Sequence, residues 1–547
     1  MIDYKDIVRQ LTHKLVNIPS VVGTAGEWDV AKAICEEYKQ LPYFQEHEDQ
    51  LIFMPVTEGM RANVLAMVRG TKGNNPEKTL VLMGHLDTVG VEDYGDLKEL
   101  AFRPDELPKH LRQHISDSAV LKDLDSGKYD FGRGGLDMKS GVASEIAVMS
   151  YFASHPEELE GTLISIAECD EEGNAEGITA ALDQLAAWKD ELGLTYYGAI
   201  NTDYSTPDNK SDDKKVIYWG SIGKMLPTFY IVGNTSHVGG VFNGFDPNLL
   251  LASITIRLSY NPDFCDHQSG ETAPPPVSLR QMDLKSHYDV QTAMEAYGYF
   301  NYFTLGTEPN RIISKMKDVA KEAFDDVIKM MGQRYNRFCQ LKQIKNDGLT
   351  WEGQVYSWEE FSGDLATVHG EKYTSYMRIF AENLLKEQPD MDIREYNLAM
   401  VREAWNRWST QQAPVVIVFN SSTYYPPVVL DEGNHLHSAL MNATTEAAKA
   451  VAGDMVETRL FYPYISDASF LYLPKDRKGM KSLQENTPGW GYVYEHPTKA
   501  IETVSMPVVN MGTWGYDGHQ ITERVDKDYV YDILPRMIHE TILRLQK

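Results

Sequence analysis

The stretch VLMGHLDTVG, residues 81–90, is an apolar run that ends in a histidine and an aspartate two positions apart. Alternation along a β-strand places residues i and i+2 on one face, so His85 and Asp87 are expected to point into one pocket. An imidazole that binds a metal usually donates its second N–H to a carboxylate, which fixes the tautomer and direction of the ring. The same short pattern is also typical of a solvated turn, so the rest of the chain must decide between the two interpretations.

Strands that alternate with helices surround this stretch. We expect strands at 78–85, 161–168 and 196–203, and a helix at 137–155 that Asp137 can cap. This alternation predicts an α/β fold with a mostly parallel-sheet catalytic domain and helices on both faces. Ligands of such sheets bind at the carboxyl ends of the strands, and each of these strands ends at or near an acidic residue or a histidine.

The chain of 547 residues is too long for a single hydrophobic core. Near residue 216 its character changes to paired strands with glycine turns, and an apolar strand returns at 413–427. We therefore predict a catalytic domain in two parts, 1–215 and 426–547, interrupted by an inserted α+β lid domain, 216–425, with an extra helical insertion. Helices of the inserted part are expected at 246–259, 309–331, 357–369 and 373–408.

Composition excludes several classes of function. The 52 lysines and arginines against 79 aspartates and glutamates give a net charge of −27, which repels nucleic acid and anionic membrane surfaces. The amino end has no apolar signal region, no run of 18 apolar residues exists, and the four cysteines form no CxxC pair. We expect a cytoplasmic protein with no nucleic-acid or membrane partner.

Four further motifs carry acidic or imidazole side chains near strand ends. They are FGRGGLDMKSG (131–141) with Asp137, AECDEEGNAEG (167–177) with Glu171 and Glu172, INTDYSTP (200–207) with Asp203, and TWGYDGHQITERV (513–525) with His519. Each alone is typical of a solvated turn, but their common position at strand ends favours a metal site. Imidazole and carboxylate donors without thiolate suit zinc, cobalt or manganese, and one carboxylate can bridge two ions. Adjacent glutamates on an extended chain diverge, so one is expected to bind metal while the other faces the attacking water.

Together the motifs resemble those of the superfamily of dinuclear-zinc exopeptidases and deacylases, which includes aminoacylase, acetylornithine deacetylase and succinyl-diaminopimelate desuccinylase. The matching segments are GHLDTV, GRGGLDMKSG, DEEGNAEG, the Asp203 loop, GSIGK with GNTSHVGG, and GHQITERV. They extend from the NIPS motif near residue 17 to residue 525. Within the superfamily, the long insertion, with PPP at 274–276 and AYGYFNYFTLG at 296–306, is similar to RocB-like arginine-utilisation proteins.

The resemblance implies two divalent metal ions, zinc in the first place and cobalt or manganese as alternatives. One ion would be bound by His85, Asp137 and Asp203, and the other by Asp137, Glu172 and His519, with Asp137 as the bridge. Glu171 would be the general base, and Asp87 would support His85. His237 of GNTSHVGG would meet the oxyanion that develops on the substrate, and Asp467 of SDAS (466–469) would lie near the substrate.

Two departures from the family pattern leave the substrate open. Val241 stands where a proline is usual, and NYFTLG (301–306) lacks the arginine that often ends this lid strand. A homodimer through the lid domain is equally open. We expect metal-dependent hydrolysis of an amide bond in an N-acyl amino acid or short peptide, in arginine or ornithine catabolism. The alternatives are a dipeptidase on the same scaffold and a catalytically silent binding or regulatory member.

Overall fold

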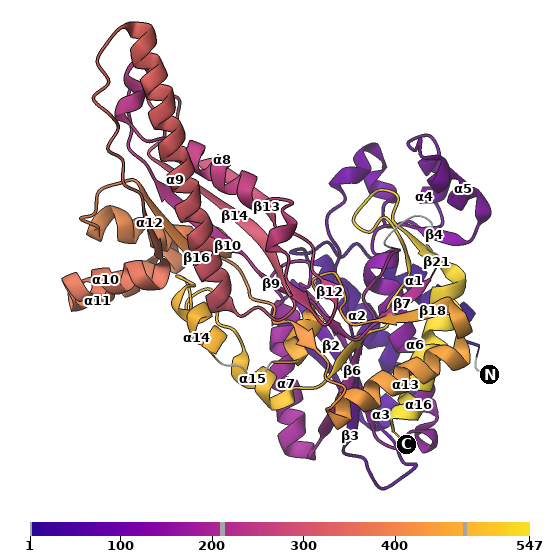
Figure 1. The fold of residues 1–547 in the computed structure, drawn as a ribbon. Coiled ribbons are helices and arrows are strands. Elements are labelled where there is room, and N and C mark those ends of the chain that lie inside the picture. The colour runs from indigo at the N-terminus through magenta and orange to yellow at the C-terminus, as the bar shows by residue number, and fades with distance from the viewer. Residues whose placement is uncertain (1–2, 208–213, 474–477, 547) are drawn as a thin grey trace. The chain divides into compact units, whose positions relative to one another are not determined.

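The computed structural model describes residues 3–207, 214–473 and 478–546 and divides the chain into two compact units (Figure 1). The first unit comprises Met1–Ile222, Pro426–Leu473 and Pro497–Lys547, and the second comprises Gly223–Tyr425 and Pro474–His496. Residues 474–496, which the sequence assigns to the catalytic domain, belong to the second unit. Within the described residues, no helix is both long and apolar enough to cross a membrane.

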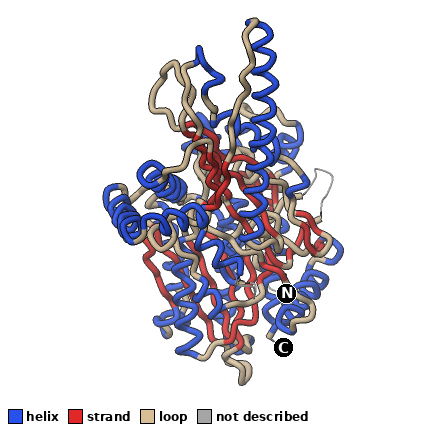
Figure 2. The backbone as a smooth tube through the Cα atoms, turned by 60° about the vertical axis from the view of Figure 1, so that its left-hand side comes forward, coloured by secondary structure: helices blue, strands red, loops and turns tan. Residues whose placement is uncertain are grey.

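The first unit is built on an eight-stranded sheet, shown among its helices in Figure 2. In spatial order its strands are β1 (Leu51–Thr57), β2 (Arg61–Arg69), β5 (Thr162–Glu168), β3 (Lys78–His85), β6 (Thr195–Asn201), β19 (Val508–Asn510), β7 (Lys215–Tyr218) and β18 (Val456–Arg459). The central pairs β5–β3, β3–β6 and β6–β19 are parallel, and antiparallel pairs flank them. The expected mostly parallel sheet of an α/β domain is confirmed.

Helices cover both faces of this sheet. The helices α1 (Lys5–Val16), α2 (Gly26–Lys39), α6 (Ser140–Ser154), α13 (His435–Val451) and α16 (Leu534–Leu545) share one hydrophobic core with alternate strand residues such as Leu80 and Leu82. The intervening Val81 and Met83 are buried outside that core. Helix α7 (Glu176–Leu192) contacts β2 and β5, and α15 (Thr498–Val504) packs against α7. Burial on both faces explains why these strands read as continuous apolar runs.

The carboxyl ends of the parallel strands meet at one edge of the sheet. Strand β3 ends at His85, β5 at Glu168 and β6 at Asn201, two residues before Asp203. The register places His85 opposite Glu168 and Met83 opposite Asn201. The segments that follow these strands therefore begin side by side, which is where parallel sheets bind ligands.

A small antiparallel sheet joins two distant segments at this edge. It has the order β20 (Gly515–Tyr516), β21 (Arg524–Asp526) and β4 (Tyr129–Phe131). Strand β4 leads into the glycine-rich turn before Asp137, and His519 lies in the loop between β20 and β21. Pairing of Arg524 with Phe131 thus brings the two loops to the same place.

The second unit contains a six-stranded sheet whose central strands are buried on both faces. Its strands are β13 (Val277–Asp283), β14 (Glu295–Thr304), β10 (Pro227–Val232), β16 (Val415–Asn420) and β15 (Gln354–Ser357), with β9 (Gly223–Met225) paired to β14. Phe229 and Ile231 pack with α8 (Pro247–Leu258) and α9 (Pro309–Lys342), whereas Tyr230 and Val232 pack with α10 (Trp358–His369), α11 (Glu371–Glu387) and α12 (Ile393–Trp408). Strict alternation along β10 accounts for the two apolar layers.

The remaining short elements are α3 (Pro42–Glu46), α4 (Leu107–Leu111), α5 (Ser118–Ser126) and α14 (Lys478–Glu485), and the strands β8 (Gly220–Ser221), β11 (His267–Gln268), β12 (Glu271–Thr272) and β17 (Val428–Val429).

Two local expectations are wrong. The segment 373–408 is not one helix, because Pro389 separates α11 from α12 and the Asp392 carboxylate accepts the Arg394 N–H as a new N-cap. Asp137 does not cap α6 either: the helix begins at Ser140 with Lys139 as its N-cap, and Asp137 lies in the distorted turn before it. Its carboxylate is engaged with two histidines instead.

Candidate metal centre

Five of the side chains expected at the site lie together in the first unit. Their donor atoms form two groups that share Asp137: His85, Asp137 and Asp203 in one, and Asp137, Glu172 and His519 in the other. Within each group, donor atoms lie within 4.8 Å of one another. Such spacing is compatible with all donors of a group reaching one ion.

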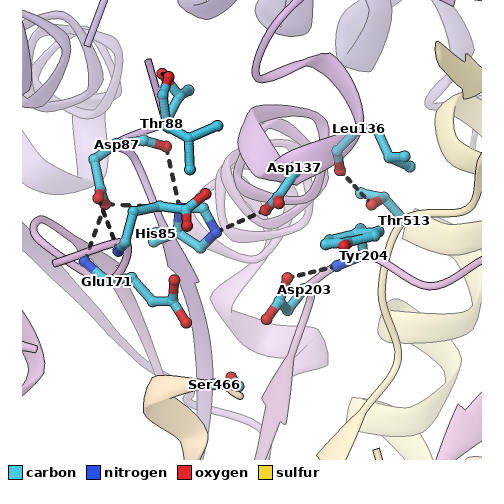
Figure 3. A network of polar contacts seen from close by, with 12 residues as sticks. His85, Asp87, Thr88, Leu136, Asp137, Glu171, Asp203, Tyr204, Ser466 and Thr513 are labelled. Atoms are coloured by element: carbon cyan, nitrogen blue, oxygen red, sulfur yellow. Dashed lines mark hydrogen bonds and ion pairs between the residues drawn. The ribbon is translucent and has the colours of Figure 1, made fainter. Parts of the chain in front are cut away.

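Asp137 presents a different oxygen to each histidine. Its Oδ1 lies 2.9 Å from His85 Nε2, and its Oδ2 lies 2.9 Å from His519 Nε2 (Figure 3 shows the His85 contact). A carboxylate used through both oxygens in this way has the geometry of a bridge between two sites. Asp203 lies at the side of Asp137, with its Oδ1 accepting the backbone N–H of Tyr204 at 2.7 Å.

Glu171 and Glu172 occupy a turn rather than the extended chain expected from the sequence. The turn begins at Asp170, whose φ is 63°, and both glutamates supply oxygens to a third group with His85. The expectation that adjacent glutamates diverge is therefore wrong here, because a turn can direct neighbouring side chains to the same side. The direction of the two side chains therefore does not distinguish the role of Glu171 from that of Glu172.

Asp87 holds this turn in place. Its carboxylate accepts the backbone N–H of Glu171 at 3.3 Å and of Glu172 at 3.1 Å. His85 Nδ1 lies 3.1 Å from the backbone oxygen of Asp87 and 3.6 Å from its Oδ1. The nearer contact of the imidazole is thus to the main chain of Asp87, while the carboxylate fixes the acidic pair (Figure 3).

Glu523 and Arg133 hold the turn that carries Asp137. The Glu523 carboxylate accepts the backbone N–H of Leu136 at 3.2 Å and of Asp137 at 3.4 Å, and it pairs with Arg133 Nη1 at 2.5 Å. Both members of the ion pair are buried, with side chains 0% and 1% exposed. Burial raises the pKa of Glu523 to about 7; the charge of Arg133 opposes this rise and the charge of Asp137 adds to it.

The site concentrates negative charge away from water. Burial, reinforced by the charge of Asp137, raises the pKa of Asp203 to about 7. Burial also raises the pKa of Glu171 well above its ordinary value and raises that of Glu172. Burial opposes protonation of His519, but its hydrogen bonds to Asp137 and Glu172 raise its pKa to about 11. Buried carboxylates of this kind are stable when a cation lies among them.

The donor set fits two divalent ions. Two imidazoles and three carboxylates, with no thiolate, match the preferences of zinc, cobalt and manganese. Asp203 and Glu171 form no ion pair with a lysine, arginine or histidine of the described residues, and burial raises the pKa of both, so a bound cation would supply their missing positive partner.

The two remaining predicted residues, Asp467 and His237, are not members of these groups. Asp467 belongs to the first unit, where it opens a 3-10 turn and is 1% exposed. His237 belongs to the second unit and is exposed, in a loop closed by paired backbone hydrogen bonds between Asn234 and Phe245. Its Nδ1 accepts the Gly239 N–H at 3.0 Å, so the neutral ring carries its proton on Nε2.

Sequence reasoning assigned no role to Arg133, Glu168 or Glu523. Arg133 and Glu523 lie inside the quoted motifs GRGGLDMKSG and GHQITERV, so their motif membership was the available signal. Glu168 ends the apolar strand TLISIAE, and an acidic residue at the end of a buried strand was the signal that could have identified it. The contacts of these residues depend on pairing between distant segments, which local patterns do not contain.

The chain is similar to known proteins both in sequence and in fold. Residues 81–484 match the model of Peptidase family M20/M25/M40. The chain is 34% identical over 543 residues to Protein RocB of Bacillus subtilis (strain 168), covering 98% of this chain and 94% of that protein. It is similar in fold to the M20 family metallo-carboxypeptidase Sso-CP2 from Sulfolobus solfataricus, with a TM-score of 0.55, 12% identity and coverage of 98% and 99%. It is also similar to the YXEP protein of Bacillus subtilis, described as a dinuclear metal binding peptidase from the M20 family, with a TM-score of 0.50, 13% identity and coverage of 99% and 98%.

Proposed function

The chain belongs to Peptidase family M20/M25/M40, and from that premise we propose that it hydrolyses an amide bond of an N-acyl amino acid or short peptide. The observation that carries the proposal is the position of Asp137, which lies 2.9 Å from both His85 and His519 and is shared by two groups of metal-ligand side chains. Glu171, a further carboxylate that is not needed for either group, lies beside them.

We assign one ion to His85, Asp137 and Asp203 and the other to Asp137, Glu172 and His519. Zinc is the proposed metal, with cobalt and manganese as alternatives, because all three accept this mixture of nitrogen and oxygen donors. When bound, such ions polarise the carbonyl group of the substrate and lower the pKa of water.

Glu171 is the proposed general base. It takes a proton from the attacking water and returns that proton to the leaving amine, which requires a carboxylate within hydrogen-bond reach of both groups. Asp87 holds the main chain of Glu171 through the backbone N–H. The same carboxylate holds Glu172, so Asp87 is proposed to set the distance between the base and a metal ligand.

His237 is the proposed donor to the oxyanion. The Gly239 N–H occupies its Nδ1, which leaves an Nε2–H on an exposed ring free to donate to a substrate oxygen. We propose that the second unit acts as a lid whose closure delivers this group and excludes water. Homodimer formation through the lid and a cytoplasmic location stay predictions.

The finer specificity that we propose is an N-acyl derivative of arginine, ornithine or a related amino acid. The alternatives are a dipeptidase and a catalytically silent binding member. A panel of N-acyl amino acids and dipeptides, incubated with protein loaded with zinc, cobalt or manganese, distinguishes them through release of free amine. Release from acyl amino acids supports the proposal, release from dipeptides alone selects the dipeptidase, and no release with any metal contradicts an enzymatic function.

A further inference from the structure

We propose that Asp467 and Glu168 form a cation-binding subsite beside Glu171, and that the substrate carries an ammonium or guanidinium group that binds there. This inference rests on the proposed function and extends it to the chemistry of the substrate. Both oxygens of Asp467 and the Oε2 of Glu168 are buried without a hydrogen-bond partner. Each of the two residues is 1% exposed, so water at the protein surface does not replace the missing partners.

The two carboxylates belong to the edge of the sheet that carries the metal centre. Glu168 ends β5 and lies opposite His85 in the parallel register. Asp467 follows Ser466, whose hydroxyl oxygen accepts the side-chain N–H of Asn201 at 2.8 Å, and Asn201 ends β6. Figure 3 shows Ser466 on the same side of the site as Glu171 and Asp203. Burial and then the charge of Glu168 raise the pKa of Asp467, which places the two carboxyl groups near one another at this edge of the sheet.

The two carboxyl groups of this pair have no cationic partner among the described residues. No lysine, arginine or histidine there forms an ion pair with Asp467 or Glu168, whereas Asp170, in the same region, is paired with Arg61. An isolated buried carboxylate costs several kcal/mol, so such a group is normally paired or loses its charge. The proposed metal ions do not remove the need, because their ligand set does not include these two carboxylates.

The missing partner must donate hydrogen bonds. All three unpartnered carboxylate oxygens are acceptors, and the complementary ligand is a positively charged group with several N–H donors. An ammonium group offers three such donors and a guanidinium group offers five in a plane. A neutral isostere of the same size, such as a ureido group, supplies donors without the charge.

The competing explanation is that Asp467 and Glu168 share one proton. Such a pair would be neutral in part and would have no preference for a cationic substrate. Burial of the two carboxyl groups is compatible with both explanations. Only the effect of the ligand's charge on binding distinguishes a cation subsite from a shared proton.

The experiment compares charged and neutral isosteres on the metal-loaded protein. N-acetyl-arginine and N-acetyl-citrulline are the first pair, with N-acetyl-ornithine and N-acetyl-norleucine as the second. We expect kcat/KM to favour the cationic member of each pair by ~10–100-fold, the range for hydrogen bonds to a buried charged group. In Asp467→Asn this preference should fall to about 1 through a rise in KM for the cationic member, with metal content unchanged. Asp454→Asn, at an exposed aspartate of the same unit, is the matched control and should keep the preference.

Binding of the free amino acids separates this inference from the proposed hydrolysis. Calorimetry with arginine and citrulline should show tighter binding of arginine to wild type and not to Asp467→Asn, even if no substrate in the panel is cleaved. Equal binding or equal hydrolysis of both members by wild type overturns the subsite. A preference that survives in Asp467→Asn overturns it as well.

Discussion

The Nε2 atom of His519 lies 2.9 Å from Oε1 of Glu172, although 347 residues separate them in the chain. Pairing of β21 with β4 places the loop after β20 beside the turn that carries Asp137. Contact of Asp137 with His85, at the end of β3 and opposite the end of β5, places both beside the turn that carries Glu172. The proposed second metal ion therefore depends on a junction between the first and the last parts of the chain.

Substitution of each glutamate of the acidic pair separates the base from the ligand. Glu171→Gln retains size and polarity but cannot accept a proton, so we expect normal metal content and a loss of turnover of ~10²–10⁴-fold. Glu172→Gln removes a charged ligand and should lose metal, with part of its activity restored by excess metal. Metal analysis and hydrolysis rates of both variants provide the check. An active Glu171→Gln variant that holds both ions would show that the base is another residue.

Metal affinity should increase as pH rises above neutrality. In the metal-free protein the pKa of His519 is raised from 6.5 to about 11, since its hydrogen bonds to Asp137 and Glu172 outweigh burial. A metal binds only the neutral ring, so between these two values protons compete with the ion and binding releases protons. Calorimetry in two buffers of different ionisation enthalpy measures that release at pH 7. Affinity that does not change over this range would contradict the assignment of His519 as a ligand, and His287→Ala, at an exposed histidine, should behave as wild type.

Glu523 should matter for both stability and metal binding. Glu523→Ala leaves the buried Arg133 guanidinium with only the partly exposed carboxylate of Asp93, and it removes the acceptor for the Leu136 and Asp137 N–H groups. We expect a loss of about 3–5 kcal/mol in the free energy of unfolding, typical of a broken buried ion pair, together with weaker metal binding.

Glu523→Gln retains an acceptor oxygen and should recover part of the metal affinity of Glu523→Ala. Urea unfolding of metal-free protein gives the stability, and titration with zinc gives the affinity. Glu432→Ala, at an exposed glutamate of the same unit, is the control for charge removal. Unchanged zinc affinity in Glu523→Ala would show that the Asp137 turn does not need this support.

Asp87 should act through the acidic turn as well as through His85. In Asp87→Asn one carboxylate oxygen becomes an amide nitrogen, so only one of the backbone N–H groups of Glu171 and Glu172 keeps an acceptor. We expect metal affinity or activity to fall by ~10–100-fold, as for other groups that orient ligands. Rates and metal content measured on one preparation identify which of the two falls, and wild-type values for both would exclude the proposed support.

His237 should affect turnover without affecting the metal centre. His237→Ala removes the proposed Nε2–H donor, and loss of one oxyanion donor reduces kcat by ~10²–10³-fold. Metal content should stay at the wild-type level, because the metal-ligand groups belong to the other unit. His287→Ala serves as the matched control at another exposed histidine of the second unit. Wild-type turnover in His237→Ala would remove this residue from the mechanism.

Local patterns predicted most of the elements that position the site. The strand that ends at His85 and the helix that follows Asp137 were both expected from apolar periodicity, since burial of a strand or a helix face imposes a regular spacing. The misjudged cap at Asp137 and the undivided helix across Pro389 are errors of boundary, where local signals compete with long-range contacts.

The sequence alone determined the α/β alternation and the chemical character of the site, because periodicity and residue type are properties of short segments. Only the tertiary structure decided which atoms meet. Pairing of β21 with β4 brings His519 to Asp137, and Asp137 gives one carboxylate oxygen to each histidine. The Asp87 carboxylate turns to the backbone of the acidic pair, while Asp467 and Glu168 are left with unpartnered oxygens. The physical reason is that hydrogen bonds and ion pairs act over a few ångströms, and the segments that make them are joined only when the sheet has formed.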